Sequence, residues 1–390
     1  MKKKILVVNN KMEMGGVSTA VISFLKNMKE DYEIDLILAE DGGEVKLLVP
    51  NDINTSYIKF PLNTGAIHKR DCKKMGIKYF LTKYFTGVLV KIFSISKFVG
   101  KKLASKTKFE DKKYDLIINN RMDFWKKRLG SCHLYSKYAE ADKKAIVLHG
   151  DFEANNYDKK FFEEEYLTVY DYVIILSEAQ KKRMIELFPK HKEKFVQIKN
   201  FESPDDIIEK SKQIEVKYPK DIINFITVSR LAPEKAFERT LLALKNLKDE
   251  GFKFCWHILG DGDLKKSLEG LIDSYKLIEN IKFYGNVENP YPYIKEADFL
   301  ALLSYNESYG LVVEEALICH TPVCMTNTIA AEEIFTNNIE GIICENSQDG
   351  VYNCLKDMFN NYKIFEKNIK NYKFDNAELK KRYKALIEDK

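Results

Sequence analysis

The stretch "KILVVNNKMEMGGVSTAVISFLKNMK" (residues 4–29) shows the pattern that decides the fold. It begins with a continuous apolar run, passes through a loop with two glycines, and continues with apolar residues at helical spacing. Continuous apolar runs suit strands that are buried on both faces of a parallel sheet. We therefore interpret the stretch as a strand, a turn and a helix, the first step of a βαβ series.

The same order repeats through the first half of the chain. Residues 178–188 show a second helical pattern, and further continuous apolar runs lie at residues 33–39, 114–119, 145–149 and 172–176. The alternation then stops at residues 204–221, which are polar and contain two prolines. Polar, proline-containing segments between periodic ones are typical of connections. We interpret residues 204–221 as a linker between two domains.

A second alternating series follows the linker. Its apolar runs lie at residues 223–229, 253–260, 281–285, 298–304, 322–326 and 340–345. The sequence therefore predicts an α/β protein with two Rossmann-like, doubly wound parallel-sheet domains, residues 1–203 and 222–375. We expect the two domains to face a central cleft, because such folds bind ligands at the carboxyl ends of their strands.

Length and composition limit the class of protein. A chain of 390 residues exceeds the usual size of one domain, and 45% hydrophobic with 31% charged residues is typical of a globular protein. The seven cysteines include no CxxC pair and the six histidines show no metal-ligand spacing. We therefore expect free thiols in the cytoplasm and no metal site. The N-terminus lacks the pattern of a signal peptide, and no apolar run is long enough to span a membrane.

The positive charge is concentrated in one segment. The net charge is +5, yet residues 68–113 contain 14 Lys or Arg and three acidic residues. Apolar residues recur at helical spacing within residues 75–106. We expect residues 75–113 to contact an anionic membrane surface, which would place the protein at the inner face of the cell membrane. The alternative is an ordinary helix with a solvated basic face. Nucleic acid is disfavoured as a partner, because the aromatic residues follow core spacing.

The stretch "NESYGLVVEEAL" (306–317) carries the first candidate site. Glu307 lies on a predicted loop, and a helix is expected to begin near residue 311. The glycine before it allows a close approach to the backbone, and free amides at a helix start bind phosphate well. The amides concerned are those of Gly310, Leu311 and Val312.

A second acid of this stretch, Glu315, lies one turn inside the predicted helix. Two carboxylates beside a phosphate site are poor phosphate ligands but good acceptors for sugar hydroxyls. The alternative is that Glu314 and Glu315 only complement the helix dipole.

The stretch "VSRLAPEKAFERTLLAL" (228–244) places two cations at a strand–helix junction. Arg230 can bind a diphosphate in a forked geometry and Lys235 as a point charge. The alternative for Lys235 is a surface ion pair with Glu234 or Glu238. A further strand–glycine–helix stretch, "ILGDGDLKKSLEGLI", is not a dinucleotide fingerprint, because Lys265 stands where the third glycine belongs.

These motifs, together with "MGGVSTAVISFL" and "IKFYGNVENPYPYIKEADFLALLSYNESYGLVVEEALICHTPV", resemble in kind and order those of retaining glycosyltransferases of the B-type, two-Rossmann fold. Family 4, which builds bacterial capsules, exopolysaccharides and teichoic-acid decorations, is the most similar. The resemblance implies a hexosyltransferase that moves a sugar from a nucleotide diphosphate sugar, here a UDP-sugar, to a hydroxyl of a cell-surface glycan, lipid-linked or protein acceptor. It also implies that a helix at residues 376–390 crosses back onto the first domain.

The resemblance assigns roles to residues of the second domain. Glu315 would bind the ribose, and Glu307 would lie against the donor sugar near the reacting carbon. Arg230 and Lys235 would hold the diphosphate with the amides of Leu311 and Val312, and the loop at Asn286 and Val287 would contact the base. The family often has glycine where this chain has Ala236, which bears on the local turn.

In the first domain, the resemblance places Gly15 and Gly16 close to the diphosphate and His149 beside the donor sugar. The catalytic set would be Glu307, His149, Arg230 and Lys235, with no metal ion and no cofactor. The configuration of the anomeric carbon would be retained in one of two ways. The acceptor could attack on the face from which the leaving group departs, or a covalent intermediate could form on Glu307.

Two other functions stay open: a sugar-nucleotide epimerase on the same fold, and a non-catalytic accessory subunit of a glycosylation complex. The donor base and sugar, the acceptor and a homo-oligomeric state are also left open.

Overall fold

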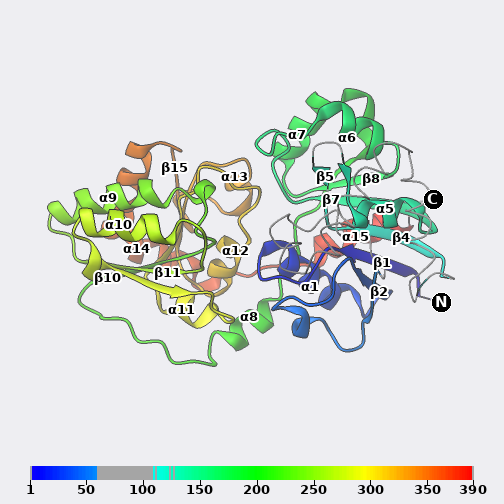
Figure 1. Ribbon diagram of the computed structural model, residues 1–390. Coiled ribbons are helices and arrows are strands. Elements are labelled where there is room, and N and C mark those ends of the chain that lie inside the picture. The colour runs from blue at the N-terminus through cyan, green and yellow to red at the C-terminus, as the bar shows by residue number, and fades with distance from the viewer. Residues whose placement is uncertain (1, 59–108, 110–111, 123, 126–127, 389–390) are drawn as a thin grey trace, which may run out of the picture. The chain divides into compact units, whose positions relative to one another are not determined.

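The computed structural model describes residues 2–58, 109, 112–122, 124–125 and 128–388. The chain divides into two compact units, each considered by itself (Figure 1). Unit 1 comprises residues 1–176, 180–201 and 376–390, and unit 2 comprises residues 177–179 and 202–375. The predicted membrane-contacting segment, residues 75–113, lies almost entirely outside the described residues.

Unit 1 is built on a seven-stranded parallel sheet with the strand order β3-β2-β1-β4-β7-β8-β9. Its strands are β1 (Lys4–Asn9), β2 (Glu33–Leu38), β3 (Asn54–Tyr57), β4 (Tyr114–Asn119), β7 (Ala141–Leu148), β8 (Tyr172–Ile175) and β9 (Phe195–Gln197). The continuous apolar runs predicted as strands are all present. The polar edge strand β3 and the short antiparallel hairpin β5 (Phe124–Trp125) and β6 (Arg128–Leu129) carry no such run, and the sequence did not predict them.

The helices of unit 1 surround this sheet. They are α1 (Gly16–Met28), α5 (Ser131–Tyr138), α6 (Lys159–Glu165), α7 (Glu178–Leu187) and α15 (Ala377–Glu388), with the 3-10 helices η1 (Lys46–Leu48) and η3 (Pro189–Lys194). The C-terminal helix α15 belongs to this unit, and its Tyr383 ring contacts Phe24 of α1 at a centroid distance of 5.0 Å.

Unit 2 holds a six-stranded parallel sheet with the order β12-β11-β10-β13-β14-β15. Its strands are β10 (Ile223–Val228), β11 (Phe254–Leu259), β12 (Ile281–Gly285), β13 (Phe299–Leu302), β14 (Val323–Thr326) and β15 (Gly341–Cys344). Its helices are α8 (Pro204–Lys210), α9 (Phe237–Asp249), α10 (Lys265–Ser274), α11 (Tyr291–Glu296), α12 (Leu311–Ile318), α13 (Ala331–Ile334) and α14 (Gln348–Asn368). Single 3-10 turns complete it: η4 (Pro233–Lys235), η5 (Ile278–Asn280) and η6 (Ile369–Asn371).

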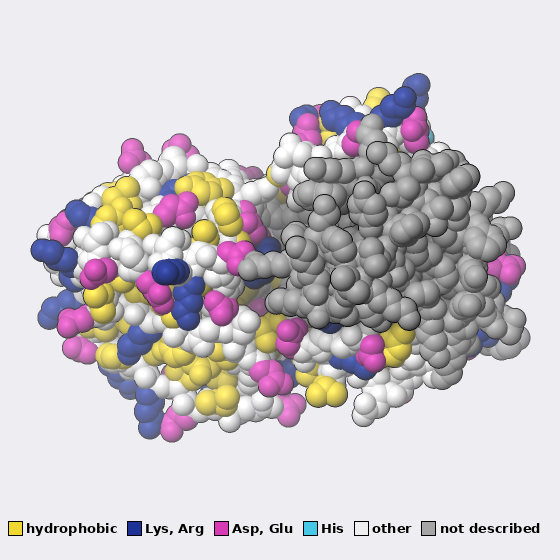
Figure 2. Space-filling view, viewed as in Figure 1, with side chains coloured by type: hydrophobic (Ala, Val, Ile, Leu, Met, Phe, Trp, Pro, Cys, Tyr) yellow, Lys and Arg dark blue, Asp and Glu magenta, His cyan; other side chains and the backbone are white. Residues whose placement is uncertain are grey.

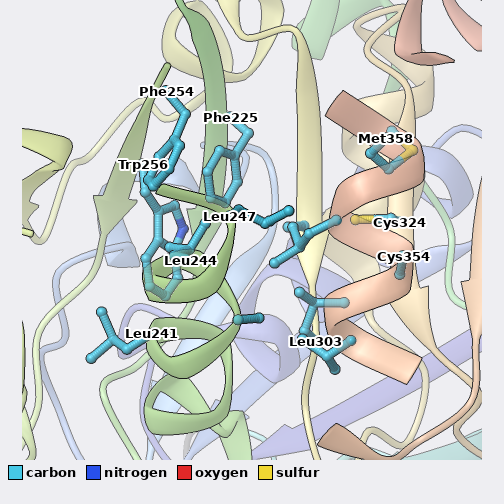
Figure 3. Packing of buried hydrophobic residues seen from close by; sticks show 14 of the residues in the cluster. Phe225, Leu241, Leu244, Leu247, Phe254, Trp256, Leu303, Cys324, Cys354 and Met358 are labelled. Carbon is cyan, nitrogen blue, oxygen red and sulfur yellow. The ribbon is translucent and has the colours of Figure 1, made fainter. Parts of the chain in front are cut away.

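The main core of unit 2 lies where α9, α10 and α14 pack on one face of this sheet. The rings of Phe225 and Trp256 stack with an interplanar angle of 9°. Figure 3 shows these rings beside the leucines of α9, with Met358 and Cys354 of α14 nearby. Full burial of each such side chain contributes roughly 1.5–3 kcal/mol, so this face anchors α9 firmly.

The segment predicted as a linker, residues 204–221, falls within unit 2, and its second half is mostly exposed to solvent. It begins with helix α8, which buries Ile207 and contacts α11 and α12. Further on, the ring of Tyr218 stacks on His257 of β11 at 3.9 Å. The sequence concealed this packing because the few apolar side chains of the segment follow no regular period.

The surface of unit 2 mixes both signs of charge. Figure 2 shows Lys, Arg, Asp and Glu side chains interspersed with hydrophobic patches on its visible face. Among the helices that the structure describes, none combines the length and the apolar character needed to cross a lipid bilayer.

The strand order of unit 2 reverses between β10 and β13, which are neighbours in the sheet. Loops leaving the carboxyl ends of strands at such a switch point are where open α/β sheets bind ligands. The loop after β10 carries Arg230 and Lys235, and the loop after β13 carries Glu307. The topology therefore brings the two candidate motifs of the second unit to one edge.

Candidate functional site

Lys235 and Glu307 form the centre of the site. The ammonium of Lys235 is ion-paired with Oε1 of Glu307, and the two side chains are 16% and 12% exposed. The backbone N–H of Tyr305 donates to the carbonyl of Glu234 at 2.9 Å, which joins the two loops directly. Lys235 therefore does not pair with Glu234 or Glu238, the alternative that the sequence left open.

Glu307 has a second partner that the sequence did not reveal. The hydroxyl of Ser304 donates to Oε1 of Glu307 at 2.9 Å. Ser304 is itself buried, and its carbonyl accepts from the hydroxyl of Thr326 at 2.6 Å. The carboxylate oxygen Oε1 is thus held by a cation and a hydroxyl.

Helix α12 begins immediately after Gly310, as the sequence predicted. Gly310 has φ +88°, a left-handed conformation that favours glycine, and a Cβ there would lie 3.0 Å from Cδ2 of Leu302. The amides of Leu311 and Val312 belong to the first turn, where N–H groups have no acceptor within the helix. Together with the helix dipole they form a positively polarised end close to Glu307 in sequence.

Glu315 lies in a different environment, inside the same helix. The hydroxyl of Tyr291 donates to its Oε1 at 3.2 Å. Burial raises the pKa of Glu315 to about 7, and the Tyr291 hydrogen bond and the charge of Lys210 offset only part of that rise. The group therefore titrates near neutral pH, unlike an ordinary glutamate.

Two further carboxyl groups lie near Glu315. Burial, followed by the charges of Glu315 and Glu314, raises the pKa of Glu202 well above its usual range. Glu314 is also buried and accepts a hydrogen bond from the hydroxyl of Tyr309 at 2.6 Å. Both Glu314 and Glu315 are buried, and Glu314 lies in the first turn of α12, so the alternative that they complement the helix dipole stays open.

Arg230 is placed differently from Lys235. Its side chain is 75% exposed and its Nη2 pairs with Oε1 of Glu234 at 3.0 Å. A solvent-exposed pair of this kind contributes roughly 0–1 kcal/mol, so a diphosphate could readily displace it. Its role as a diphosphate ligand stays a prediction.

The residue after Lys235 is in the left-handed conformation, which favours glycine. Ala236 has φ +52° and ψ +38°, which is left-handed, and it is fully buried. An L-residue in this conformation costs roughly 1–2 kcal/mol. The alanine therefore strains the turn.

The glycines of "ILGDGDLKKSLEGLI" support the Arg230 turn. A Cβ at Gly260 would lie 1.9 Å from the carbonyl oxygen of Ser229, and one at Gly262 would lie 2.4 Å from that of Leu231. The N–H of Leu231 donates to the carbonyl of Asp261 at 3.0 Å. These glycines allow two backbones to touch, which explains their spacing without a dinucleotide.

The predicted base-contacting loop follows β12. Gly285 has φ +69° and its carbonyl accepts from the N–H of Gly260 at 2.7 Å. Asn286 is exposed and Val287 is half-buried. The loop is thus attached to the glycine turn that supports Arg230, and its contact with a base stays a prediction.

The remaining predicted residues lie in unit 1. Gly15 has φ +147° and precedes α1, which begins at Gly16, and no atom of the described residues lies within 4 Å of the Cβ that Gly15 lacks. His149 follows β7, and its buried Nε2 has no hydrogen-bond partner in the described part of the chain. Burial, with a smaller effect of Arg121, lowers the pKa of His149 to about 4, so its imidazole is neutral at pH 7.

Comparison with known proteins identifies the fold and finds a family model that matches part of the chain. Residues 207–374 match the family described as "Glycosyl transferases group 1". Over its whole length, the chain superimposes on the crystal structure of Anabaena HepE in complex with UDP and glucose, with a TM-score of 0.72, 19% identity and 100% of each chain covered. The protein therefore has the B-type glycosyltransferase fold of two Rossmann-like domains.

The relatives found by sequence each match only part of the chain. The Escherichia coli O-antigen biosynthesis glycosyltransferase WbnH is 27% identical over 52% of this chain and 55% of its own. The Campylobacter jejuni N-acetylgalactosamine-N,N'-diacetylbacillosaminyl-diphospho-undecaprenol 4-alpha-N-acetylgalactosaminyltransferase is 33% identical over 27% of this chain and 30% of its own. The chain thus spans about a third to a half of these relatives. The family match includes Arg230, Lys235, Glu307 and Glu315.

Proposed function

We propose that the protein is a retaining glycosyltransferase that uses a UDP-sugar as donor. The observation that carries the proposal is the Lys235–Glu307 ion pair, whose glutamate lies three residues before Gly310, the residue that precedes α12. A cation suited to a diphosphate and a carboxylate suited to sugar hydroxyls are thereby placed side by side. The proposal is also supported by the family match of residues 207–374 and by the UDP and glucose in the HepE structure.

The donor would lie along the edge of the second sheet. Its diphosphate would be held by Lys235, by Arg230 once released from Glu234, and by the amides of Leu311 and Val312. Lys235 has three N–H donors, so it can bind a phosphate oxygen while it keeps Glu307. Glu315 would accept the ribose hydroxyls, and the loop of Asn286 and Val287 would meet the base.

Transfer breaks the bond between the anomeric carbon and the diphosphate oxygen and forms one to the acceptor oxygen. The acceptor proton moves to the departing diphosphate. Positive groups already in place at that diphosphate stabilise the charge that develops on it, and such stabilisation often lowers the barrier more than any other effect. Since Lys235, Arg230 and a helix end supply this charge, we propose that no metal ion is needed. Glu307 would stabilise the positive charge on the sugar, or bond to it.

His149, in unit 1, stays a predicted contact of the donor sugar. Its neutral imidazole can accept a hydrogen bond from a sugar hydroxyl at Nε2, which has no partner among the described residues. Gly15, with its open approach, would allow the diphosphate or the acceptor to come close to the backbone at Gly16.

We propose a cell-envelope acceptor, either a glycan or a lipid-linked sugar. The support is the names of two relatives, one in O-antigen biosynthesis and one acting on a diphospho-undecaprenol substrate. Such an acceptor would place the protein on the cytoplasmic face of the membrane, with residues 75–113 as the contact.

The test is a screen of nucleotide sugars with lipid-linked and soluble glycan acceptors, with and without EDTA. We expect a new α-linked product from one α-configured UDP-sugar at an unchanged rate in EDTA, detected by mass spectrometry and NMR. Conversion of donor alone to an isomeric sugar nucleotide would instead show an epimerase. Donor binding without turnover on any acceptor would favour an accessory subunit.

A further inference from the structure

The side chain of Arg239 is a buried cation that the proposed chemistry does not use. It lies in the first turn of α9 and is 5% exposed. Nη2 donates to the carbonyls of Leu303 at 2.9 Å and Ser304 at 3.3 Å, and Nη1 donates to Oδ1 of Asn346 at 2.8 Å. Among the residues that the structure describes, all its hydrogen-bond acceptors are therefore neutral carbonyl oxygens. Burying a charge without a charged partner is costly, so its position calls for an explanation.

The guanidinium holds the turn that leads from β13 to Glu307. The carbonyl of Tyr305 accepts from Nδ2 of Asn346 at 2.8 Å, so Asn346 links Arg239 to the next residue of the turn. Cζ of Arg239 also lies 4.5 Å from the centre of the Tyr305 ring. Hydrogen bonds and a cation–π contact together fix residues 303–305 against the start of α9.

The same helix carries Lys235 at its entrance. Only Ala236, in its left-handed conformation, separates Lys235 from the first residue of α9. Arg239 is thus four residues from Lys235 on one side and bonded to the turn of Glu307 on the other. We propose that Arg239 is a positioning residue, whose buried guanidinium sets the separation between Lys235 and Glu307 and so preorganises the donor diphosphate site. This inference rests on the proposed function and deepens it.

Arginine is suited to this position and lysine is not. The planar guanidinium reaches Asn346 and two backbone carbonyls at once. The ammonium of a lysine is a compact charge and cannot hold these three acceptors in one fixed geometry. Arg239→Lys should therefore keep the charge but lose the alignment of the turn.

The test compares Arg239→Met and Arg239→Lys with Leu247→Ala, a control on the same helix that is fully buried in the core away from the turn. Steady-state transfer is measured where circular dichroism shows each variant folded. We expect Arg239→Met to lower kcat/KM at least about tenfold, because a small misplacement of catalytic groups is costly. Arg239→Lys should recover only part of this loss, and Leu247→Ala should stay within about twofold of the native protein. An Arg239→Met rate equal to that of Leu247→Ala would overturn the inference.

A second measurement does not depend on turnover. UDP affinity is determined by calorimetry for the native protein, Lys235→Met, Arg239→Met and the double variant. We expect Lys235→Met to weaken UDP binding less when Arg239 is already replaced, since the two residues act together. An equal factor in both backgrounds would show independent action and overturn the inference alone. No effect of Lys235→Met in the native background would contradict the proposed diphosphate site, and this inference with it.

If Arg239→Met does not fold, Asn346→Ala serves in its place, because Asn346 is exposed and its loss removes one acceptor of the guanidinium. It should lower kcat/KM in the same direction, and an unchanged value would overturn the inference.

Discussion

Two glutamates eight positions apart in one motif have opposite surroundings. Glu307, on the loop before α12, accepts from Lys235 and Ser304. Glu315, inside α12, accepts from the neutral hydroxyl of Tyr291 and lies near Glu202, another buried carboxyl group. The same residue type therefore has a cationic partner in one place, and in the other it is buried with a raised pKa.

The difference shows how one motif can serve two tasks. A carboxylate bonded to a cation and a hydroxyl has a fixed position, which suits the reacting end of a donor. A buried carboxyl group whose pKa is near 7 can accept hydroxyl hydrogen bonds in a way that depends on pH. If this contrast is correct, substitutions at Glu307 and at Glu315 should have different effects on activity and on its pH dependence.

The largest effect is expected on the Glu307 side. Lys235→Ala and Glu307→Ala should each lower transfer by at least about 100-fold, because each removes a charge from the reacting centre. The measurement is the initial rate with saturating donor and acceptor, on protein whose circular dichroism matches the native form.

The matched control for these variants is Lys245→Ala. Lys245 lies on the exposed side of α9 in an ion pair with Asp249, so its replacement should leave the rate unchanged. A Lys235→Ala or Glu307→Ala variant with near-native rate would remove that residue from the mechanism.

The next effect concerns Glu315 and pH. The folded pKa of Glu315 is raised from 4.5 to about 7, so between these values the native state holds a proton that the unfolded chain has released. The free energy of unfolding should therefore fall as pH rises from about 4.5 to 7, by about 3 kcal/mol for this group. Urea titrations of the native protein and Glu315→Gln across this pH range measure the change. The same pH dependence of the free energy of unfolding in both proteins would contradict the raised pKa of Glu315.

The ionisation of Glu315 should also affect the affinity for UDP. An ionised carboxylate is the better acceptor for ribose hydroxyls, so the UDP affinity of the native protein should rise from pH 6 to pH 8 relative to that of Glu315→Gln. Calorimetry at both pH values checks this. A constant ratio between the two proteins would show that the protonation of Glu315 does not matter for binding.

A smaller effect tests the support of the Arg230 turn alone. Gly260→Ala would bring a Cβ against the carbonyl of Ser229 at a φ of +132°, and should destabilise the protein by about 2 kcal/mol or more. Thermal unfolding measures the loss. Gly270→Ala on α10 is the control, because its added Cβ has no atom within 4 Å in the part of the chain that the structure describes, and it should stabilise by about 0.5–1 kcal/mol. Equal effects of the two substitutions would show that the glycine turn is not a close contact.

The smallest effect is expected at Ala236. Glycine there would relieve roughly 1–2 kcal/mol of left-handed strain but lose a buried methyl group and gain unfolded-state entropy, each worth about 0.5–1 kcal/mol. Ala236→Gly should therefore change the free energy of unfolding by less than about 1 kcal/mol. A loss of several kcal/mol, measured by urea titration, would mean that the methyl contact and not the turn geometry determines this position.

The sequence predicted the sheet strands that are apolar and buried, because their side chains carry the pattern themselves. It did not predict β3 or the packing of residues 204–221, where polar edges and irregular spacing conceal the structure. The Glu307 side of the site was partly predictable, since Lys235 and Glu307 each follow a strand that ends at the same switch point.

The partners of these residues could not be predicted in the same way. Ser304, Tyr291 and Arg239 act through side-chain contacts, and those of Tyr291 and Arg239 reach residues far along the chain, so no local period marks them. One signal was present for Arg239, which lies four residues before Ala243 and eight before Leu247, on the buried side of α9. A charged residue at core spacing indicates a buried polar contact.

The most direct test is a crystal structure of the protein with UDP. We expect a phosphate oxygen within hydrogen-bonding distance of Nζ of Lys235, the amides of Leu311 and Val312 directed at the diphosphate, and the ribose hydroxyls on Glu315. UDP bound elsewhere, with the Lys235–Glu307 pair and the first turn of α12 free of ligand, would contradict the account.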